Sequence, residues 1–576
     1  MMRFREGHES WQTPPWLVCW SLVLLLGVVS LVTVSSQAQS SNSSDSATEV
    51  IHGKVINSVT QSPIPRALVQ SPDGRYAMLT DSDGHFEFNV PMQSSDDRAG
   101  FVYSGPTPNA WISGSHMPFP VIARKPGFID LPDQVSATAS SSDSDVTIYL
   151  MPEGIIKGRV TNGGDETAAG ITVQLFNRAV DQGMPRWVRG ASAQANSVGE
   201  FRFAELQPGS YKLATQEWMD NDQLAIPGAQ VYGYPPLYYP GSADFANAGA
   251  IELGGGQTVE ANLSLTRQRY YQVRIPLANG DLSNGLNISV EGQQGTRYEL
   301  GYNAGEQRIE GMLPSGNYVV RASSYGPNSV SGSVSLRVAD APAQGPAMTL
   351  TPNSAIRVSV KEEFTDKSWN GSGQWGQFPL RGPRLYLQAN LESADDLEQG
   401  AVGLRPPVAP NDENLILEAV PPGRYRLHVS TQRGYVASAM MGETDLLRQP
   451  VTIAFGSSAP IEITLRDDGA ELDGTISSLT ANASSAHRGA GAWVYCVPMP
   501  ESTGQFQEVG VSEDGKFNLP MMAPGDYRIF AFSKQQPRLP YGDAEAMKEY
   551  ETSGQVVHLG AGQKTSVQVE LASPPE

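Results

Sequence analysis

The length and composition of the chain exclude both a single small domain and a disordered chain. It has 576 residues, of which 40% are apolar and 17% are charged, and at about 100–200 residues per domain this length indicates roughly three to five domains. The formal net charge of −20 opposes binding to nucleic-acid phosphates and to anionic membrane surfaces, so we expect no nucleic-acid partner.

The N-terminus has the order of an export signal. Arg3 and Arg5 precede an apolar run over residues 17–34, and a small-x-small pattern ends at Ala38. This order predicts a signal peptide that is cleaved after Ala38. The run is also long enough to span a bilayer, so an uncleaved N-terminal transmembrane helix is the alternative, with residues 17–34 as the membrane contact. Both interpretations export the remainder to the periplasm, the cell surface or the medium.

The two cysteines are Cys19, inside the apolar run, and Cys496. Removal of the signal would leave one thiol, so the exported chain cannot form an internal disulfide. Cys496 alternates with apolar neighbours in "AWVYCVPMP" and is predicted to be a buried strand residue. Stability must therefore come from apolar cores.

A Gly-x-Tyr motif follows a turn four times, in "LQPGSYKL", "LPSGNYVV", "VPPGRYRL" and "MAPGDYRI". Its tyrosines are Tyr211, Tyr318, Tyr425 and Tyr527, spaced by about one hundred residues, which is the size of a whole β-sandwich. Two further echoes have a similar period. One is a strand glycine, at Gly53, Gly158 and Gly474, and the other is Gly-x-Phe, in "DGHFEF", "VGEFRF" and "DGKFNL".

Between these motifs apolar and polar residues alternate in short runs such as "ITVQLF" and "PIEITL", which is typical of half-buried strands. The sequence therefore predicts an all-β chain of tandem antiparallel β-sandwich domains, prealbumin-like or Ig-like, with almost no helix. The short connections between domains favour a stiff, extended row. The predicted segments are a signal or anchor over 1–38, a Ser-rich tether over 39–48, and β-sandwiches over 49–152, 153–267, 268–352, 353–467 and 468–576.

The first predicted domain resembles the carboxypeptidase regulatory-like domain, a prealbumin-like sandwich grouped with carbohydrate-binding-like folds. The motifs that carry the resemblance are Gly53-x-Val55, Pro63-Ile64-x-x-Ala67-x-Val69, Thr80-Asp81-x-Asp83-Gly84-x-Phe86-x-Phe88 and Ala123-x-Lys125-Pro126-Gly127-Phe128. The full layout is similar to bacterial exported proteins built only of such repeats. That resemblance implies export and a binding or structural role, and it implies no reaction.

The sequence offers no recognisable catalytic centre. It has no His-x-x-Glu pair after the apolar run, no Gly-x-Ser-x-Gly elbow and no phosphate-binding loop. No two of its seven histidines stand at metal-ligand spacing on a shared element, so we expect neither a metal site nor a cofactor. A calcium site at Asp81, Asp83 and Glu87 is a weak alternative to a simple turn at Gly84.

The repeated tyrosine has two interpretations. At the corner of a sandwich it would bury its ring and donate its hydroxyl to a nearby carbonyl, which braces the corner. In that case the preceding glycine would supply a positive φ to the turn, and the tyrosine would open the strand. A sugar-stacking tyrosine would instead be exposed. We expect the brace.

Two aromatic stretches fit a purely structural role less well. "VYGYPPLYYPG" holds Tyr232, Tyr234, Tyr238 and Tyr239, and "WNGSGQWGQF" holds Trp369 and Trp375. Aromatic rings on stiff or Gly-rich loops can form flat faces for sugar rings or extended peptides. The alternative is that they fold back over a seam between domains. These six residues are the candidate ligand-binding residues of the chain.

The sequence thus favours a non-catalytic exported protein that acts as a binding or structural module of the cell envelope, with carbohydrate as the first ligand to test. The alternative is an accessory subunit of an envelope enzyme or transporter that binds protein. An enzyme with an unrecognised site is a third and weaker interpretation.

Overall fold

The computed structural model describes residues 48–71, 74–91, 119–129, 137–139, 146–163, 167–219, 230–279, 285–292, 296–326, 328–369, 371–376, 378–395, 400–456, 458–477, 492–502, 504–512 and 514–572. The predicted signal, the alternative membrane anchor and most of the tether lie outside these ranges. Within them, no helix is both long and apolar enough to cross a membrane.

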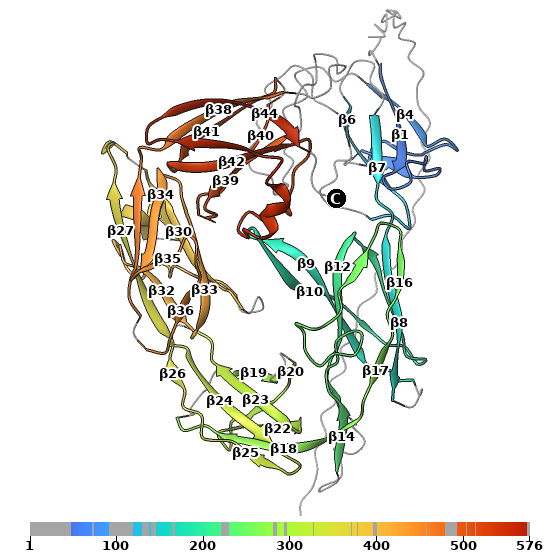
Figure 1. The fold of residues 1–576 in the computed structure, drawn as a ribbon, viewed down its shortest axis with the longest axis vertical. Coiled ribbons are helices and arrows are strands. Elements are labelled where there is room, and N and C mark those ends of the chain that lie inside the picture. Colours follow the sequence, from blue (N-terminus) through green and yellow to red (C-terminus); the bar gives the residue numbers. More distant parts are fainter. Residues whose placement is uncertain are drawn as a thin grey trace, which may run out of the picture.

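The predicted all-β fold is confirmed: the described residues form strands and only two short 3-10 helices (Figure 1). Strands such as β7 and β37 alternate buried and exposed side chains, as the sequence pattern indicates. We group the strands into five units in chain order.

Unit one contains β1 (Thr48–Asn57), β2 (Leu68–Gln70), β3 (Ala77–Leu79), β4 (His85–Pro91), β5 (Phe119–Arg124), β6 (Ala137–Ala139) and β7 (Val146–Leu150). Unit two contains β8 (Gly154–Asn162), β9 (Thr172–Asp181), β10 (Met184–Gln194), β11 (Glu200–Leu206), β12 (Gly209–Thr215), β13 (Trp218–Met219), β14 (Val231–Tyr234), β15 (Ile251–Leu253), β16 (Thr258–Glu260) and β17 (Leu263–Leu265). Unit three contains β18 (Gln268–Pro276), β19 (Asn287–Gly292), β20 (Arg297–Tyr298), β21 (Gly301–Asn303), β22 (Arg308–Pro314), β23 (Gly316–Ser323), β24 (Val330–Val338), β25 (Ala343–Gln344) and β26 (Thr351–Pro352).

Unit four contains β27 (Ser354–Glu363), β28 (Gly373–Trp375), β29 (Phe378–Leu380), η2 (Gly382–Leu385), β30 (Leu387–Ser393), β31 (Val402–Gly403), β32 (Leu415–Val420), β33 (Gly423–Thr431), β34 (Tyr435–Met441), β35 (Thr444–Asp445), β36 (Val451–Ile453) and β37 (Ile461–Arg466). Unit five contains β38 (Ala470–Ser477), β39 (Trp493–Met499), β40 (Gln507–Gly510), β41 (Lys516–Met522), β42 (Gly525–Phe532), η3 (Ala546–Tyr550), β43 (Gln555–Leu559) and β44 (Lys564–Ala572).

All five units share one pairing plan. The opening strand of each unit pairs antiparallel with one later strand and parallel with another near the end of the unit. These triplets are β4-β1-β7, β11-β8-β16, β22-β18-β25, β32-β27-β37 and β41-β38-β44. Among the described residues, the five largest buried apolar clusters each draw their side chains from one unit.

The two repeated glycine motifs of the sequence, the strand glycine and Gly-x-Phe, lie opposite each other on paired strands. The strand glycine pairs in register with the phenylalanine of the Gly-x-Phe motif in Gly53–Phe86, Gly158–Phe201 and Gly474–Phe517. A Cβ added at Gly474 would lie 2.1 Å from Cζ of Phe517. The glycine is therefore required because the phenylalanine ring lies over it, which explains why the two motifs recur together.

Replacing Gly474 with alanine should destabilise unit five by about 1–3 kcal/mol, because the Phe517 ring must leave its place in the core. Gly510→Ala in the same unit is the matched control, since the nearest atoms to its added Cβ lie 3.9 Å away. Amide hydrogen exchange in β38 and β41 of the full chain measures the effect. Equal protection in the two variants would contradict this account.

The predicted tyrosine corner is confirmed in all four copies. Each hydroxyl donates to the carbonyl four residues earlier, and each ring is buried. The bonds are Tyr211 to Gln207 (2.6 Å), Tyr318 to Pro314 (2.8 Å), Tyr425 to Pro421 (2.9 Å) and Tyr527 to Ala523 (2.8 Å). The tyrosine is thus a brace for the corner, and its hydroxyl is not available to a ligand.

The role predicted for the motif glycine is wrong in part. The strand begins at the glycine, two residues before the tyrosine. Only two of the four glycines, Gly209 and Gly525, have a positive φ, at 155° and 156°. At Gly316 a Cβ would lie 2.9 Å from the Tyr318 hydroxyl. There the glycine leaves room for the ring that folds back over it.

Units two and three share a sheet. Strands β13 and β14 belong to unit two by sequence, yet β14 pairs with β18 through Val231–Tyr270 and Tyr232–Arg269. The resulting sheet has the order β13-β14-β18-β22-β21 and crosses the predicted boundary at 267/268. Part of the tyrosine-rich stretch therefore lies in this shared sheet.

A buried carboxyl lies at the same seam. The Glu299 N–H donates to Oε2 of Glu217 at 3.2 Å, whereas Oε1 is buried and has no hydrogen-bond partner in the described structure. The Tyr270 hydroxyl faces this carboxyl without reaching hydrogen-bond geometry. Burial raises the pKa of Glu217 to about 7, the Glu299 N–H and Tyr270 oppose the rise, and the Glu299 carboxylate adds to it.

The seam should loosen as the pH rises. The pKa of Glu217 is raised on folding, so its neutral form stabilises the seam below its ordinary pKa of 4.5, and this stability is lost as the pH rises to about 7. Hydrogen-exchange protection of β13 and β14, corrected for intrinsic rates, should fall by up to about tenfold per pH unit in this window. Glu217→Gln should remove the dependence, and exposed Glu462→Gln should retain it. The same pH profile in both variants would exclude this role for Glu217.

The units do not form the extended row that the short connections favour. Unit five returns to the β9–β10 hairpin of unit two (Figure 1), where the Gly542 N–H donates to the Gly183 carbonyl at 2.9 Å. Arg538 of unit five donates to Oε1 of Gln207 at 2.6 Å. The same hairpin approaches unit four, with Arg186 3.8 Å from Glu392. Units two to five therefore close into a ring. A short linker limits the motion between two units, but it does not determine the angle at which they are joined.

Candidate functional site

The most exposed of the predicted ligand-binding residues lie on an insertion of unit four between β27 and β30. We call residues 364–386, apart from 370 and 377, the aromatic insertion. It contains the β28–β29 hairpin, in which Trp375 pairs with Phe378. Trp375 is 57% exposed and Trp369 is 39% exposed, both unusually high for tryptophan. The insertion thus presents two large rings to solvent.

An arginine holds the aromatic rings at the base of the insertion. The guanidinium carbon of Arg433 lies 3.9 Å from the ring centre of Phe364, 5.3 Å from that of Trp369 and 6.0 Å from that of Tyr386. Trp369 also meets Tyr386 edge to face at 5.3 Å. Arg433 donates to the Asp366 carbonyl as well. These contacts fix Trp369, since each cation–π contact is worth about 0.5–2 kcal/mol.

Asp467 holds the N-terminal end of the aromatic insertion in place. Its carboxylate accepts from the N–H of Thr365 at 2.8 Å and of Asp366 at 2.9 Å, and from the Thr365 hydroxyl at 3.0 Å. Burial acts to raise the pKa of Asp467, but these hydrogen bonds outweigh it and hold the pKa below its ordinary value. The carboxylate therefore stays ionised and keeps the chain turn at 365–366 in place.

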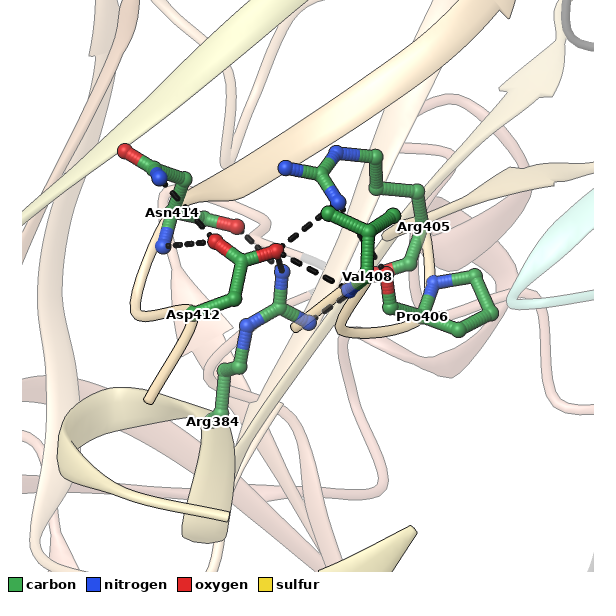
Figure 2. Close-up of polar contacts among 6 residues, drawn as sticks. All are labelled: Arg384, Arg405, Pro406, Val408, Asp412 and Asn414. Atoms are coloured by element: carbon green, nitrogen blue, oxygen red, sulfur yellow. Dashed lines mark hydrogen bonds and ion pairs between the residues drawn. The ribbon is translucent and has the colours of Figure 1, made fainter. Parts of the chain in front are cut away.

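A buried ion cluster holds the C-terminal end of the aromatic insertion in place (Figure 2). Arg384, in η2, donates to the carbonyls of Arg405 and Asn414, and its guanidinium lies 3.9 Å from Asp412. Arg405 donates to the same carboxylate at 2.9 Å. The side chains of Arg384, Arg405 and Asp412 are only 6%, 13% and 5% exposed. The cluster fixes the loop 405–414 to the end of the insertion.

The Asp412 carboxylate is also held by its own loop. The N–H groups of Val408 and Asn414 donate to it at 3.2 and 3.1 Å, and the Asn414 side chain donates at 3.0 Å. Burial acts to raise the pKa of Asp412, but these donors and Arg405 hold it well below its ordinary value. The charge is thus permanent at physiological pH.

The exposed rings of this arrangement are suited to binding. Exposed, rigid aromatic faces stack on sugar rings or on extended peptides, and their low mobility reduces the entropy lost on binding. In the described part of the chain, no group of His, Cys, Asp or Glu side chains is placed to hold a metal ion. The Asp81 carboxylate accepts from the N–H groups of Asp83 and His85, as a turn requires.

The four candidate tyrosines of unit two do not form one exposed face. Tyr232 is half-buried, with the Arg267 guanidinium 4.4 Å from its ring centre. Tyr234 is buried 5.8 Å from Trp218. Tyr238 is buried 5.4 Å from Phe245, and half-buried Tyr239 packs against the unit-two core. The structure buries or half-buries these four rings, whereas it exposes Trp369 and Trp375 on one insertion.

Several residues of the site carry no sequence signal. Arg433, Asp467 and Arg384 are ordinary charged residues in their local sequence, and their contacts reach across many residues, 102 between Thr365 and Asp467. The loop "RPPVAPNDEN" does carry a turn signal, with prolines before Asp412 and Asn414. That signal predicts a loop but not the two arginines that meet there.

Comparison with known proteins finds no match to any family model and none among curated proteins. The resemblance of unit one to the carboxypeptidase regulatory-like domain therefore rests on its motifs. Among solved structures, the Bacillus anthracis TIE protein matches at 10% identity and a TM-score of 0.14, over 92% of this chain and 69% of that one. A streptococcal ancillary pilin matches at 16% identity and a TM-score of 0.17, over 53% of this chain and 100% of that one. BcpA, the major pilin subunit of Bacillus cereus, matches at 10% identity and a TM-score of 0.13, over 55% of this chain and 99% of that one. TM-scores this low carry no information on function, and the all-β assignment rests on the strand pairing.

Proposed function

We propose that this protein is a non-catalytic exported binding module, and that the aromatic insertion of unit four is its ligand-binding surface. The observation that carries the proposal is the exposure of Trp369 and Trp375 on a segment whose two ends are held in place, one by Asp467 and the other by the ion cluster around Asp412. A purely structural ring would be buried, and a mobile loop would lack the Asp467 and Asp412 anchors.

Carbohydrate is the first ligand we propose. A tryptophan face offers a flat apolar surface that matches the C–H face of a sugar ring, and polar groups beside it can bind hydroxyls. The carboxylate of Glu362 accepts from the Tyr386 hydroxyl at 2.5 Å next to the rings. The alternative is a protein partner of the envelope, bound through an extended peptide on the same rings.

We further propose the domain and targeting layout that the sequence predicts. The β-sandwich domains would occupy 49–152, 153–267, 268–352, 353–467 and 468–576, with the first in the carboxypeptidase regulatory-like family. The five one-unit cores support these limits, and the sheet shared across 267/268 makes the second and third domains interdependent. Residues 1–38 would direct export or act as an anchor.

Glycan-array binding by the chain from residue 39 onward tests the proposal. We expect Trp375→Ala and Trp369→Ala to weaken glycan binding by at least about tenfold, because each removes a central aromatic contact. Tyr325→Ala is the matched control, since Tyr325 is 68% exposed on unit three. Binding that survives both tryptophan changes would remove the insertion from consideration. Binding of an envelope protein, but of no glycan, would select the protein-binding alternative.

A further inference from the structure

The end of the β9–β10 hairpin closes the ring by contacting units four and five together. At unit five, the Gly542 N–H donates to the Gly183 carbonyl at 2.9 Å. Gly183 has a φ of 76°, and a Cβ added to it would lie 2.6 Å from Cδ2 of Tyr541. At unit four, Arg186 lies 3.8 Å from Glu392. Because both contacts come from the end of one hairpin, we expect them to form and break together.

The contact with unit four is made by charged groups and a histidine. The hairpin contributes Arg186 and Asp181, which lie on one of its faces, 3.8 Å apart. Unit four contributes Glu392 of β30, which is opposite Arg426 of β33 in the strand register, and His428 on the same face of the sheet. Nε2 of His428 lies 2.9 Å from Oε2 of Glu392. The Glu392 carboxylate is therefore shared between the hairpin and the histidine.

This contact is poorly hydrated. The side chains of Arg186, His428 and Glu392 are only 11%, 15% and 21% exposed. Nη1 of Arg186 and Nε2 of His428 are buried and form no hydrogen bond with the described residues. A proton on His428 would thus add a further cation beside Arg186 and Arg426, at a place where water gives it little solvation.

The closed ring therefore favours neutral His428. Burial lowers the pKa of His428 below its ordinary value of 6.5, Glu392 and Asp181 oppose this shift, and Arg186 adds to it. When the hairpin leaves, it takes Arg186 and Asp181 with it and water reaches the imidazole, whereas Glu392 stays on the neighbouring strand. The pKa of His428 is then higher in the open ring than in the closed one.

The other charges nearby do not reverse this direction. Arg426 belongs to the same sheet as His428 and stays beside it in both forms, and Asp543 of unit five acts on Arg426. Because the open ring binds the proton more tightly, the closed ring loses stability as the pH falls below about 6.5.

We propose that protonation of His428 releases the β9–β10 hairpin from unit four and shifts the ring toward its open form. The imidazole takes up one proton from solvent, and no other covalent bond changes. The exported chain is then closed at neutral pH and opens in a mildly acidic medium. The device lies apart from the aromatic insertion and does not depend on what that insertion binds.

Amide hydrogen exchange at Gly542, in the chain from residue 39 onward, reports on closure, because this N–H is bonded across the ring contact. Corrected for intrinsic rates, its protection should fall by up to about tenfold per pH unit between about pH 6.5 and pH 5. His428→Gln cannot titrate and should give a level profile. His558→Gln is the matched control and should keep the wild-type profile, since His558 is 72% exposed on unit five.

Gly183→Ala supplies a reference for the open ring. Its side chain would be strained at a positive φ and would meet Tyr541, so Gly542 should be unprotected at every pH. Small-angle X-ray scattering should show a larger radius of gyration for this variant, which the wild type approaches only in acid. Protection in β39 and β42 should stay constant throughout, because the units remain folded.

Three results would overturn the proposal. The first is wild-type protection of Gly542 that does not change between about pH 7.5 and pH 5. The second is the same fall in His428→Gln as in the wild type, which would assign the effect to the carboxylates. The third is a parallel loss of protection in β39 and β42, which would mean that unit five unfolds in acid.

Discussion

Replacing Asp412 with alanine should destabilise unit four by about 3–5 kcal/mol, the largest effect that we expect from a single substitution outside the tyrosine corners. The change removes the one carboxylate shared by Arg384 and Arg405 and leaves two buried guanidinium groups without a counter-charge. It also leaves the N–H groups of Val408 and Asn414 without their acceptor. Protection of β30 and β32 in native-state hydrogen exchange measures the loss.

Two controls define the cause. Asp395→Ala breaks an exposed pair with Arg424 in the same unit, where both side chains are more than half exposed, and should cost less than about 1 kcal/mol. Combining Asp412→Leu with Arg384→Met and Arg405→Met should restore much of the stability, because no buried charge remains. A small effect of Asp412→Ala would show that water reaches the cluster. In that case the insertion has no second anchor.

The second large effect is expected at the tyrosine corner of unit five. Tyr527→Phe should cost about 1–3 kcal/mol, because it leaves the Ala523 carbonyl without its donor in a buried site. Tyr527→Ala should cost roughly 3–5 kcal/mol, because it also opens a cavity in the core. Exposed Val556→Ala in the same unit should change stability little. Hydrogen exchange in β42 and β39 measures all three.

Ligand affinity should be measured on the same two Tyr527 variants. A brace predicts that stability changes while glycan affinity stays constant for the protein that remains folded. The reverse result, lost affinity with unchanged protection, would contradict the role of the corner. The hydroxyl geometry at all four corners argues for the brace.

The local features of the fold could be predicted because each one depends on neighbours in sequence. A tyrosine that bonds to the carbonyl four residues earlier needs only the turn before it, so its repeat can be recognised along the sequence. Gly474 and Phe517 can be recognised as members of two separate motifs, although their contact across strands cannot be predicted from the sequence. The shared sheet of β14 and β18 escaped prediction, because the prolines after "VYGY" favour a loop, whereas these four residues form a strand between β13 and β18.

The contacts that build the site could not be predicted, because they join distant residues through ordinary side chains. Arg433 and Asp366 are 67 residues apart, and no periodicity links them. Arg433 gains its role only because β33 ends beneath the insertion. The exposed tryptophans were identifiable by composition, whereas the buried state of Tyr234 and Tyr238 follows from tertiary packing against Trp218 and Phe245.

The contact between unit five and unit two also determines how the chain responds to tension. A pull between unit one and the end of unit five would pass to unit five through the Gly183–Gly542 and Arg538–Gln207 bonds, and through the contact of Lys534 with the Tyr149 ring of unit one. Units three and four lie in the closed loop and would carry no load until those few bonds break. Breaking these bonds would open the ring and add the length of units three and four to the distance between the two ends. The protein would therefore extend in one early step, before any β-sandwich unfolds.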